Sequence, residues 1–179
     1  IKDQIKKLDY KTRIEKFIPY GKHSITNADI EEVLKVLKSD QITQGLKIPE
    51  FEESISKKVQ SKHSISVNSA TSALHLACIA LGLNKNDYLW TSPISFVASA
   101  NCGLYCGAKI DFIDINPNTG LICIEALKAK LEIADREGNL PKIIIPVHLA
   151  GTSCDMYEIN RLSKMYGFRV IEDASHAIG

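Results

Sequence analysis

The sequence lacks a strong excess of either charge. Its 22 Lys and Arg residues stand against 21 Asp and Glu residues, a formal net charge of +1 over 179 residues. This balance argues against binding to nucleic acid or to an anionic membrane surface, because both depend on a concentrated positive field. Basic and acidic side chains are interleaved in the first two dozen positions, so we interpret that segment as a solvated helix or arm.

Long apolar runs and paired cysteines are also missing. No stretch approaches the roughly 20 apolar residues of a transmembrane helix, and the N-terminus lacks the apolar core of a signal peptide. The five cysteines form no CxxC pair, which argues against a zinc site, and their odd number argues against a disulfide framework. We therefore expect a cytoplasmic protein with reduced, mostly buried thiols and no metal.

The strongest phosphate-binding glycine patterns, GxGxxG and GxxxxGKS/T, are absent as well. From about residue 64 onward, however, short β-rich runs alternate with helical stretches. The predicted strands are residues 64–67, 88–92, 109–115, 142–148 and 168–173. This βαβ rhythm predicts an α/β fold in which helices sandwich a mostly parallel sheet.

Two helices are predicted ahead of this sheet. Thr26 is placed to cap a helix over residues 27–39, and residues 51–60 have the apolar spacing of a second amphipathic helix. With no internal repeat or low-complexity tract, we predict an N-terminal extension over residues 1–22, followed by part of one α/β domain over residues 23–179.

In an open parallel sheet, ligands bind beyond the C-terminal ends of the strands. The small residues of "NSATSALH" (68–75) connect a predicted strand to a helix, so the first helical N–H groups could hold a phosphate. Ordinary N-capping by Ser69 or Thr71 is the alternative. Phe96 is expected one turn into the next helix, where its ring either stacks on a planar ligand or is simply part of the core.

Asp173 ends the last predicted strand, next to His176. Burying an unpaired carboxylate costs several kcal/mol, so a partner is expected. A bound heterocycle with a protonated ring nitrogen would serve, and so would a helix N-terminus or a nearby lysine. His176 could donate to the same ligand, whereas His148 is interpreted as a hydrogen-bonded structural histidine.

Four segments carry a resemblance to a known family. They are "NSATSALHLACIALGL", "TSPISFVASANCGLYCGAKIDFIDINPNTG", "IIIPVHLAGTSCDM" and "VIEDASHAIG". Together they resemble the N-terminal half of a DegT-type nucleotide-sugar aminotransferase, a pyridoxal phosphate (PLP) enzyme with the aspartate aminotransferase fold (fold type I). The resemblance runs from about Ile18 to the last residue and implies the large domain of that fold, truncated.

The resemblance also implies roles for single residues. Ala70 and Thr71 would hold the phosphate of PLP through backbone amides and a hydroxyl, and Phe96 would stack on the pyridine ring. Asp173 would pair with the ring nitrogen, and His176 would approach the phenolic oxygen. Many relatives have glycine where Ala70 stands. The alanine of this chain narrows the backbone freedom of the turn.

The implied reaction is transamination of a nucleotide-linked 4-keto-6-deoxy sugar, with glutamate as the amino donor, in a homodimer. The expected substrate is a UDP-linked N-acetyl sugar of surface-glycan biosynthesis of the pseudaminic acid type, and the loop of residues 43–45 lies near the substrate in relatives. The family's Schiff-base lysine follows "DASHAIG" and has no counterpart before Gly179. We therefore expect a part of the enzyme that is inactive by itself.

Two alternatives stay open. A relative that uses PLP for sugar dehydration has histidine at the lysine position, so that position would separate deoxygenation from amination. A doubly wound domain with a purely binding role is the alternative outside catalysis.

Overall fold

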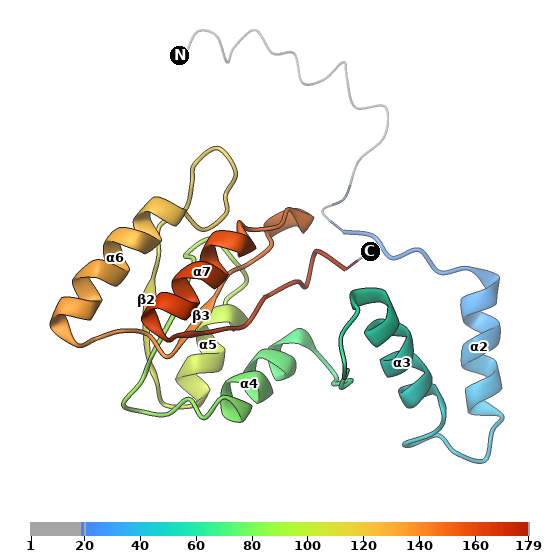
Figure 1. The fold of residues 1–179 in the computed structure, drawn as a ribbon. Helices are drawn as coiled ribbons and strands as arrows, with labels where there is room; N and C mark the ends of the chain where they lie inside the picture. Colours follow the sequence, from blue (N-terminus) through green and yellow to red (C-terminus); the bar gives the residue numbers. More distant parts are fainter. Residues whose placement is uncertain (1–18, 20, 179) are drawn as a thin grey trace, which may run out of the picture. The chain divides into compact units, whose positions relative to one another are not determined.

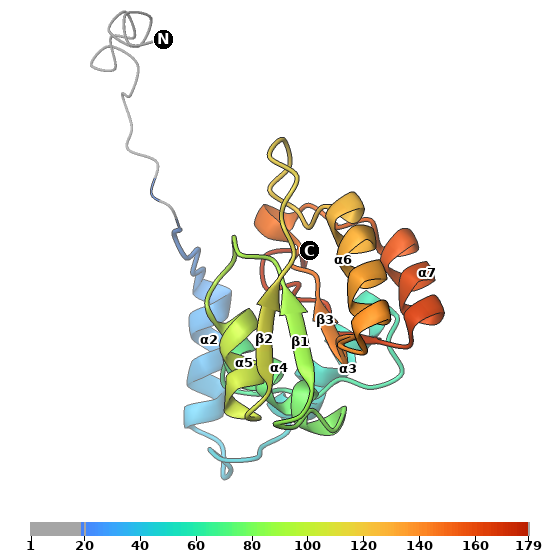
Figure 2. The same ribbon diagram turned by 90° about the vertical axis from the view of Figure 1, so that its left-hand side faces the viewer.

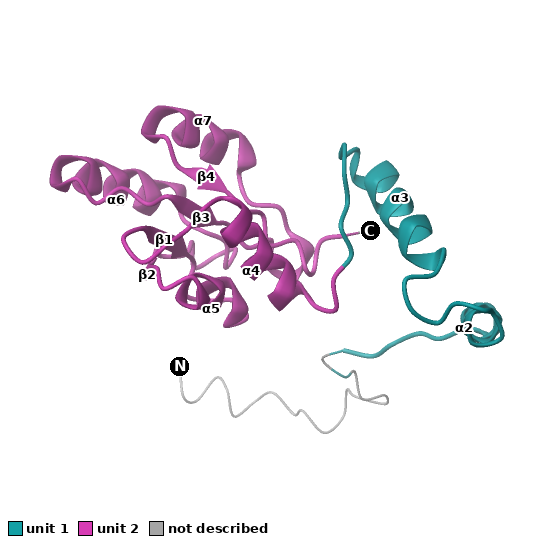
Figure 3. Ribbon diagram, turned by 90° about the horizontal axis from the view of Figure 1, so that it is seen from below, with its two compact units in different colours: residues 1–66 teal, residues 67–179 magenta. Residues whose placement is uncertain are grey.

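The computed structural model describes residue 19 and residues 21–178, in two compact units of residues 1–66 and 67–179 (Figure 3). The predicted extension over residues 1–22 lies almost entirely outside the described residues, so its boundary stays a prediction. No helix in the described part of the chain is both long and apolar enough to cross a membrane.

The first unit contains helices α2 (Asn27–Leu37) and α3 (Lys47–Val59). The predicted cap of α2 is confirmed, because the Thr26 hydroxyl accepts the Asp29 N–H while the Asp29 carboxylate accepts the Thr26 N–H. Helix α3 begins four residues before the predicted start. Pro49 is compatible with this earlier start, because the N–H groups of the first helical turn have no partner within the helix and proline lacks only that group.

The second unit is built on a four-stranded sheet in the order β2-β1-β3-β4, with every pair of strands parallel. Its strands are β1 (Tyr88–Thr91), β2 (Lys109–Phe112), β3 (Ile143–Ile145) and β4 (Arg169–Val170). Figure 2 shows β1 beside β2, with both strands running the same way. The predicted parallel sheet is confirmed, although each strand is shorter than the apolar run that suggested it.

Helices cover both faces of this sheet (Figure 1). They are α4 (Ala70–Ala80), α5 (Ala98–Tyr105), α6 (Ile124–Glu137) and α7 (Met156–Tyr166). Successive strand residues point to opposite faces, so Leu89 joins the core under α4 and α5, while Trp90 joins the core under α6 and α7. The predicted α/β sandwich is therefore confirmed.

One predicted strand, residues 64–67, is wrong. These residues form no strand, and Ile65 is 81% exposed. A strand requires a neighbour for its backbone groups, and among the described residues the Ser66 N–H instead donates to the Glu52 carboxylate at 2.7 Å. The apolar run is present, but in the described part of the chain no strand pairs with it.

Trp90, the single tryptophan of the sequence, lies at the centre of this unit. It is 2% exposed, and its indole Nε1–H has no hydrogen-bond partner among the described residues. The Lys130 ammonium lies 5.0 Å from the centre of the indole ring and 2.6 Å from the Asp111 carboxylate. A cation over an aromatic face in this range is attractive.

The order of the strands determines where a ligand can bind. From β1 the chain crosses through α5 to β2 on one side, and from β3 it crosses through α7 to β4 on the other. Neighbouring strands whose connections leave in opposite directions mark a switch point, and ligands of open α/β sheets bind beyond the strand ends there. This point lies between β1 and β3.

Candidate functional site

The site is built around the carboxylate of Asp173, which is 7% exposed. Asp173 lies just beyond β4, held by a parallel bridge to Val147 and by a 3.0 Å hydrogen bond from its N–H to the Pro146 carbonyl. Its backbone carbonyl accepts the His148 N–H at 3.0 Å. The end of β3 therefore holds the Asp173 backbone in place, and the predicted strand-end position is confirmed.

Three donors from two serines meet the carboxylate. The Ser99 hydroxyl donates to Oδ2 at 2.7 Å, and Oδ1 accepts the Ser175 hydroxyl at 2.6 Å and the Ser175 N–H at 3.2 Å. In the described part of the chain no lysine, arginine or histidine forms an ion pair with Asp173. The lysine alternative of the sequence analysis is therefore absent there.

This environment fits a cationic ligand. Hydroxyl and amide donors stabilise a carboxylate but leave its charge unneutralised, and a buried charge is normally paired. A carboxylate has about four acceptor positions, of which three are occupied here. A protonated ring nitrogen, as in PLP, would supply both the missing donor and the missing positive charge.

The N-terminus of α4 supplies free backbone donors. Ser69 is the N-cap, and its hydroxyl accepts the Ser72 N–H at 3.2 Å. The amides of Ala70 and Thr71 stand ahead of Ser72 and have no partner within the helix. Capping by Ser69 and a phosphate site on Ala70 and Thr71 therefore do not compete, and the phosphate site stays a prediction.

Helix α4 precedes β1 and packs in the same core cluster as that strand. Helix α4 ends at Ala80, and a short turn leads from it into the start of β1. A helix that leads through a short turn into a strand of a parallel sheet runs antiparallel to that strand, so we expect the α4 N-terminus to be directed toward the C-terminal ends of the strands. Gly82, with φ +71°, follows the C-cap Leu81 and turns the chain away from the helix axis.

The prediction for Phe96 is partly wrong. Helix α5 begins at Ala98, so Phe96 lies in the preceding loop rather than one turn into the helix. The sequence "SPIS" stays non-helical beyond β1, which delays the helix. Phe96 is 72% exposed, which excludes the core alternative, and its stacking role stays a prediction.

His176 is exposed and lies in a turn directly after Asp173. This turn approaches the loop that follows β3, since a Cβ on Gly151 would lie 3.1 Å from the His176 carbonyl oxygen. Gly151 has φ +86° and follows Ala150, a non-glycine residue with φ +53°. His176 lies three residues after Asp173 in the chain. Its contact with the cofactor stays a prediction.

His148 has the structural role that its sequence predicts. It is 5% exposed; its Nδ1 accepts the Cys154 N–H at 3.1 Å, and its Nε2 lies 2.9 Å from the Glu172 carboxylate. Because Nδ1 accepts, the proton is on Nε2 and is donated to Glu172. Both ring nitrogens are therefore satisfied within the protein.

The serines at Asp173 were not among the predicted site residues. Ser99 is 1% exposed, and its Oγ lies 2.9 Å from that of Ser95. Ser95 and Ser99 both lie in the segment "TSPISFVASAN", which carries part of the family resemblance. Ser99, however, is 74 positions away from Asp173 in the sequence. Only the placement of both residues beyond parallel strands could have suggested this contact.

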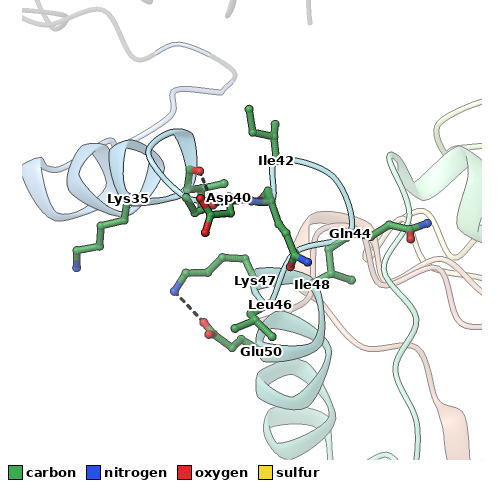
Figure 4. Close-up of a pocket in the computed structure, with 12 residues that line it drawn as sticks. Lys35, Asp40, Ile42, Gln44, Leu46, Lys47, Ile48 and Glu50 are labelled. Carbon is green, nitrogen blue, oxygen red and sulfur yellow. Dashed lines mark hydrogen bonds and ion pairs between the residues drawn. The ribbon is translucent and has the colours of Figure 1, made fainter.

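A separate pocket of about 540 Å³ lies in the first unit (Figure 4). It lies between the end of α2 and the start of α3, and of the predicted substrate loop it includes Gln44 and Gly45. Gln44 has φ +51°, and a Cβ on Gly45 would lie 2.9 Å from the Gln41 carbonyl oxygen. The loop conformation therefore requires glycine at position 45.

Three of the five cysteines, Cys78, Cys102 and Cys154, are buried. All five are free, and among the described residues no group of three His, Cys, Asp or Glu side chains is arranged to hold a metal ion. Cys78 is fully buried between α4 and the sheet, and Cys102 is fully buried between α5 and the sheet. A hydrogen bond with Cys102, together with burial, raises the pKa of the Cys78 thiol, which keeps it protonated.

The comparisons with known proteins identify the class. The sequence matches the DegT/DnrJ/EryC1/StrS aminotransferase family over residues 23–179. An aminotransferase from Psychrobacter cryohalolentis superposes with a TM-score of 0.80 at 32% identity, over 92% of this chain and 40% of that one. NtdA from Bacillus subtilis, solved with bound cofactor PMP, superposes with a TM-score of 0.75 at 33% identity, over 87% of this chain and 35% of that one.

The chain therefore belongs to the DegT/DnrJ/EryC1/StrS aminotransferase family. Among its relatives, the UDP-4-amino-4,6-dideoxy-N-acetyl-β-L-altrosamine transaminase of Campylobacter jejuni is 43% identical over 162 residues. The match covers 90% of this chain and 42% of that protein, so the chain spans about two fifths of its relative's length. The predicted family and fold are confirmed.

Proposed function

We propose that this chain forms the cofactor-holding part of a PLP-dependent aminotransferase that acts on a nucleotide-linked 4-keto-6-deoxy sugar. The observation that carries the proposal is the buried Asp173 carboxylate, which has three hydrogen-bond donors but no cationic partner among the described residues. The bound NtdA cofactor and the name of the Campylobacter relative support the cofactor and the substrate class.

Bound PLP supplies an electron sink. Its protonated ring accepts the electrons that are released when a proton leaves the substrate carbon bonded to the amino nitrogen. Asp173 keeps the ring nitrogen protonated by offering it a buried negative charge. The free amides of Ala70 and Thr71 bind the phosphate at the N-terminus of α4, where the helix dipole favours an anion. Phe96 would stack on the ring, and His176 would approach its phenolic oxygen.

The remaining features rest on the family. The proposed donor is glutamate, the proposed substrate is a UDP-linked N-acetyl sugar for a surface glycan such as pseudaminic acid, and the proposed assembly is a cytoplasmic homodimer. In the family that this chain resembles, the lysine that bonds the cofactor follows the segment corresponding to "DASHAIG". The matched relative is named a transaminase, which favours amination over sugar dehydration.

The test measures PLP binding to the complete gene product by its visible absorbance band. We expect Asp173→Ala to weaken binding by at least about 30-fold, because losing one partner of a buried charge pair costs about 2–5 kcal/mol. Asp114→Ala is the matched control, since Asp114 is an exposed carboxylate that follows β2. Equal affinities for both variants would overturn the proposal.

A further inference from the structure

We propose that Ser99 is a positioning residue that sets the charge and the free acceptor position of Asp173, with Ser95 acting through it. This inference rests on the proposed function, because it concerns how Asp173 meets a protonated ring nitrogen. It adds residues of helix α5 and of the loop before it to a site otherwise defined by strand ends and by the α4 N-terminus.

The first step is the assignment of the two carboxylate oxygens. Oδ1 accepts both the hydroxyl and the N–H of Ser175, which fill its two acceptor positions. In the described part of the chain, Oδ2 accepts only the Ser99 hydroxyl. The remaining acceptor position of Asp173 therefore belongs to Oδ2, and the ring N–H binds the same oxygen that Ser99 holds.

The second step is the direction of the hydroxyl protons. Ser99 has one proton and two acceptors within reach, Asp173 Oδ2 at 2.7 Å and the Phe96 carbonyl at 3.2 Å. The charged acceptor at the shorter distance forms the stronger bond. Because the Ser99 proton is then committed, the 2.9 Å contact with Ser95 requires the Ser95 hydroxyl to be the donor. The two hydroxyls thus form a chain directed at Asp173.

The third step is the effect on the shared proton. A hydrogen bond to a carboxylate stabilises its charged form and lowers its affinity for a proton. Ser99 therefore keeps the proton on the ring nitrogen rather than on Asp173, and Ser95 strengthens this effect by polarising Ser99. Ser99 is 1% exposed, so water does not replace its hydroxyl when it is removed.

The experiment uses the complete gene product and PLP labelled with ¹⁵N in its ring. We expect Ser99→Ala to weaken PLP binding about tenfold, equal to about 1.4 kcal/mol, and to move the ring ¹⁵N chemical shift from the protonated toward the neutral value. Ser95→Ala should move both quantities in the same direction, with about a two- to threefold loss of affinity.

The matched control is Ser163→Ala, which removes a hydroxyl bonded to the Phe168 carbonyl at 2.6 Å, in the turn that ends α7. It should leave the affinity and the ¹⁵N shift unchanged. Thermal unfolding confirms that each variant is folded. If Ser99→Ala does not fold, Ser95→Ala still tests the chain of hydroxyls that is directed at Asp173. A Ser99→Ala shift and affinity equal to those of Ser163→Ala would overturn the inference alone. Absence of PLP binding to the wild type would overturn the proposed function and, with it, this inference.

Discussion

Strands β3 and β4 are neighbours in the sheet, and beyond the end of each a polar side chain is buried. At β3, His148 has a protein partner on each ring nitrogen. At β4, Asp173 has three donors, no cation in the described part of the chain, and one acceptor position left on Oδ2. A fully satisfied polar group serves the fold, whereas a buried charge with a vacant acceptor position is suited to a ligand.

The comparison predicts that His148 mainly affects stability. His148→Ala should lower the free energy of unfolding by about 2–4 kcal/mol, because it leaves the buried Cys154 N–H unpaired and opens a cavity. Urea denaturation followed by circular dichroism measures this loss. The control is His75→Ala, which removes an edge-on ring contact with Tyr105 and should cost about 1 kcal/mol. Similar losses in both variants would contradict the structural role.

Asp173 should show the opposite behaviour. Asp173→Asn keeps the size of the side chain, and we expect it to change the free energy of unfolding by only about 1 kcal/mol. The affinity for PLP should fall about 30-fold, since a neutral amide supplies no charge to a protonated ring, a loss of about 2 kcal/mol. Denaturation and absorbance titration of the same preparation measure both quantities. A large stability loss with unchanged affinity would reverse the two assignments.

The contact between the loops after the two strands gives a smaller effect. Gly151→Ala should cost about 2 kcal/mol, because it forces alanine into a left-handed conformation and places its Cβ 3.1 Å from the His176 carbonyl oxygen. Gly138→Ala isolates the backbone cost, since that position has φ +69° and no atom within 4 Å. It should lose about 1 kcal/mol in thermal denaturation. Equal losses would show that the two loops do not meet.

The smallest effect extends the comparison to two helix N-termini. Ser69→Ala and Thr26→Ala each remove a capping hydroxyl and should each cost about 1 kcal/mol of stability. Only Ser69→Ala should also weaken PLP binding, because Ser69 orders the turn that presents the amides of Ala70 and Thr71. The affinity for PLP, measured for both variants, separates capping from phosphate binding. Weakened PLP binding in Thr26→Ala would refute the assignment of the phosphate site to α4.

The features predicted well from the sequence are those with local causes. The Thr26 capping box marks the start of α2 at the predicted position. The apolar runs at 142–148 and 88–92 were correctly predicted as parallel strands, because strands covered on both faces consist mainly of apolar residues. Local chemistry was sufficient for each of these elements.

The errors and omissions concern features that depend on distant partners. Residues 64–67 have the composition of a strand, but pairing requires a neighbour that this composition does not reveal. The Ser99 contact with Asp173 spans 74 positions, and no pattern around Ser99 indicates it. Asp173 itself is predicted because a carboxylate at the end of a buried strand is costly to bury without a partner. The sequence therefore predicts the central carboxylate of the candidate site but not the hydroxyls around it.

The placement of Trp90 gives these residues a built-in optical probe. It is the single indole of the sequence, and it lies on β1, next to the strand that leads to His148, with its ring removed from water. Its fluorescence emission should lie at short wavelength in the folded state and shift to longer wavelength when the sheet separates from α6. Lys130 above the ring makes the same emission sensitive to the loss of that helix before the strands part.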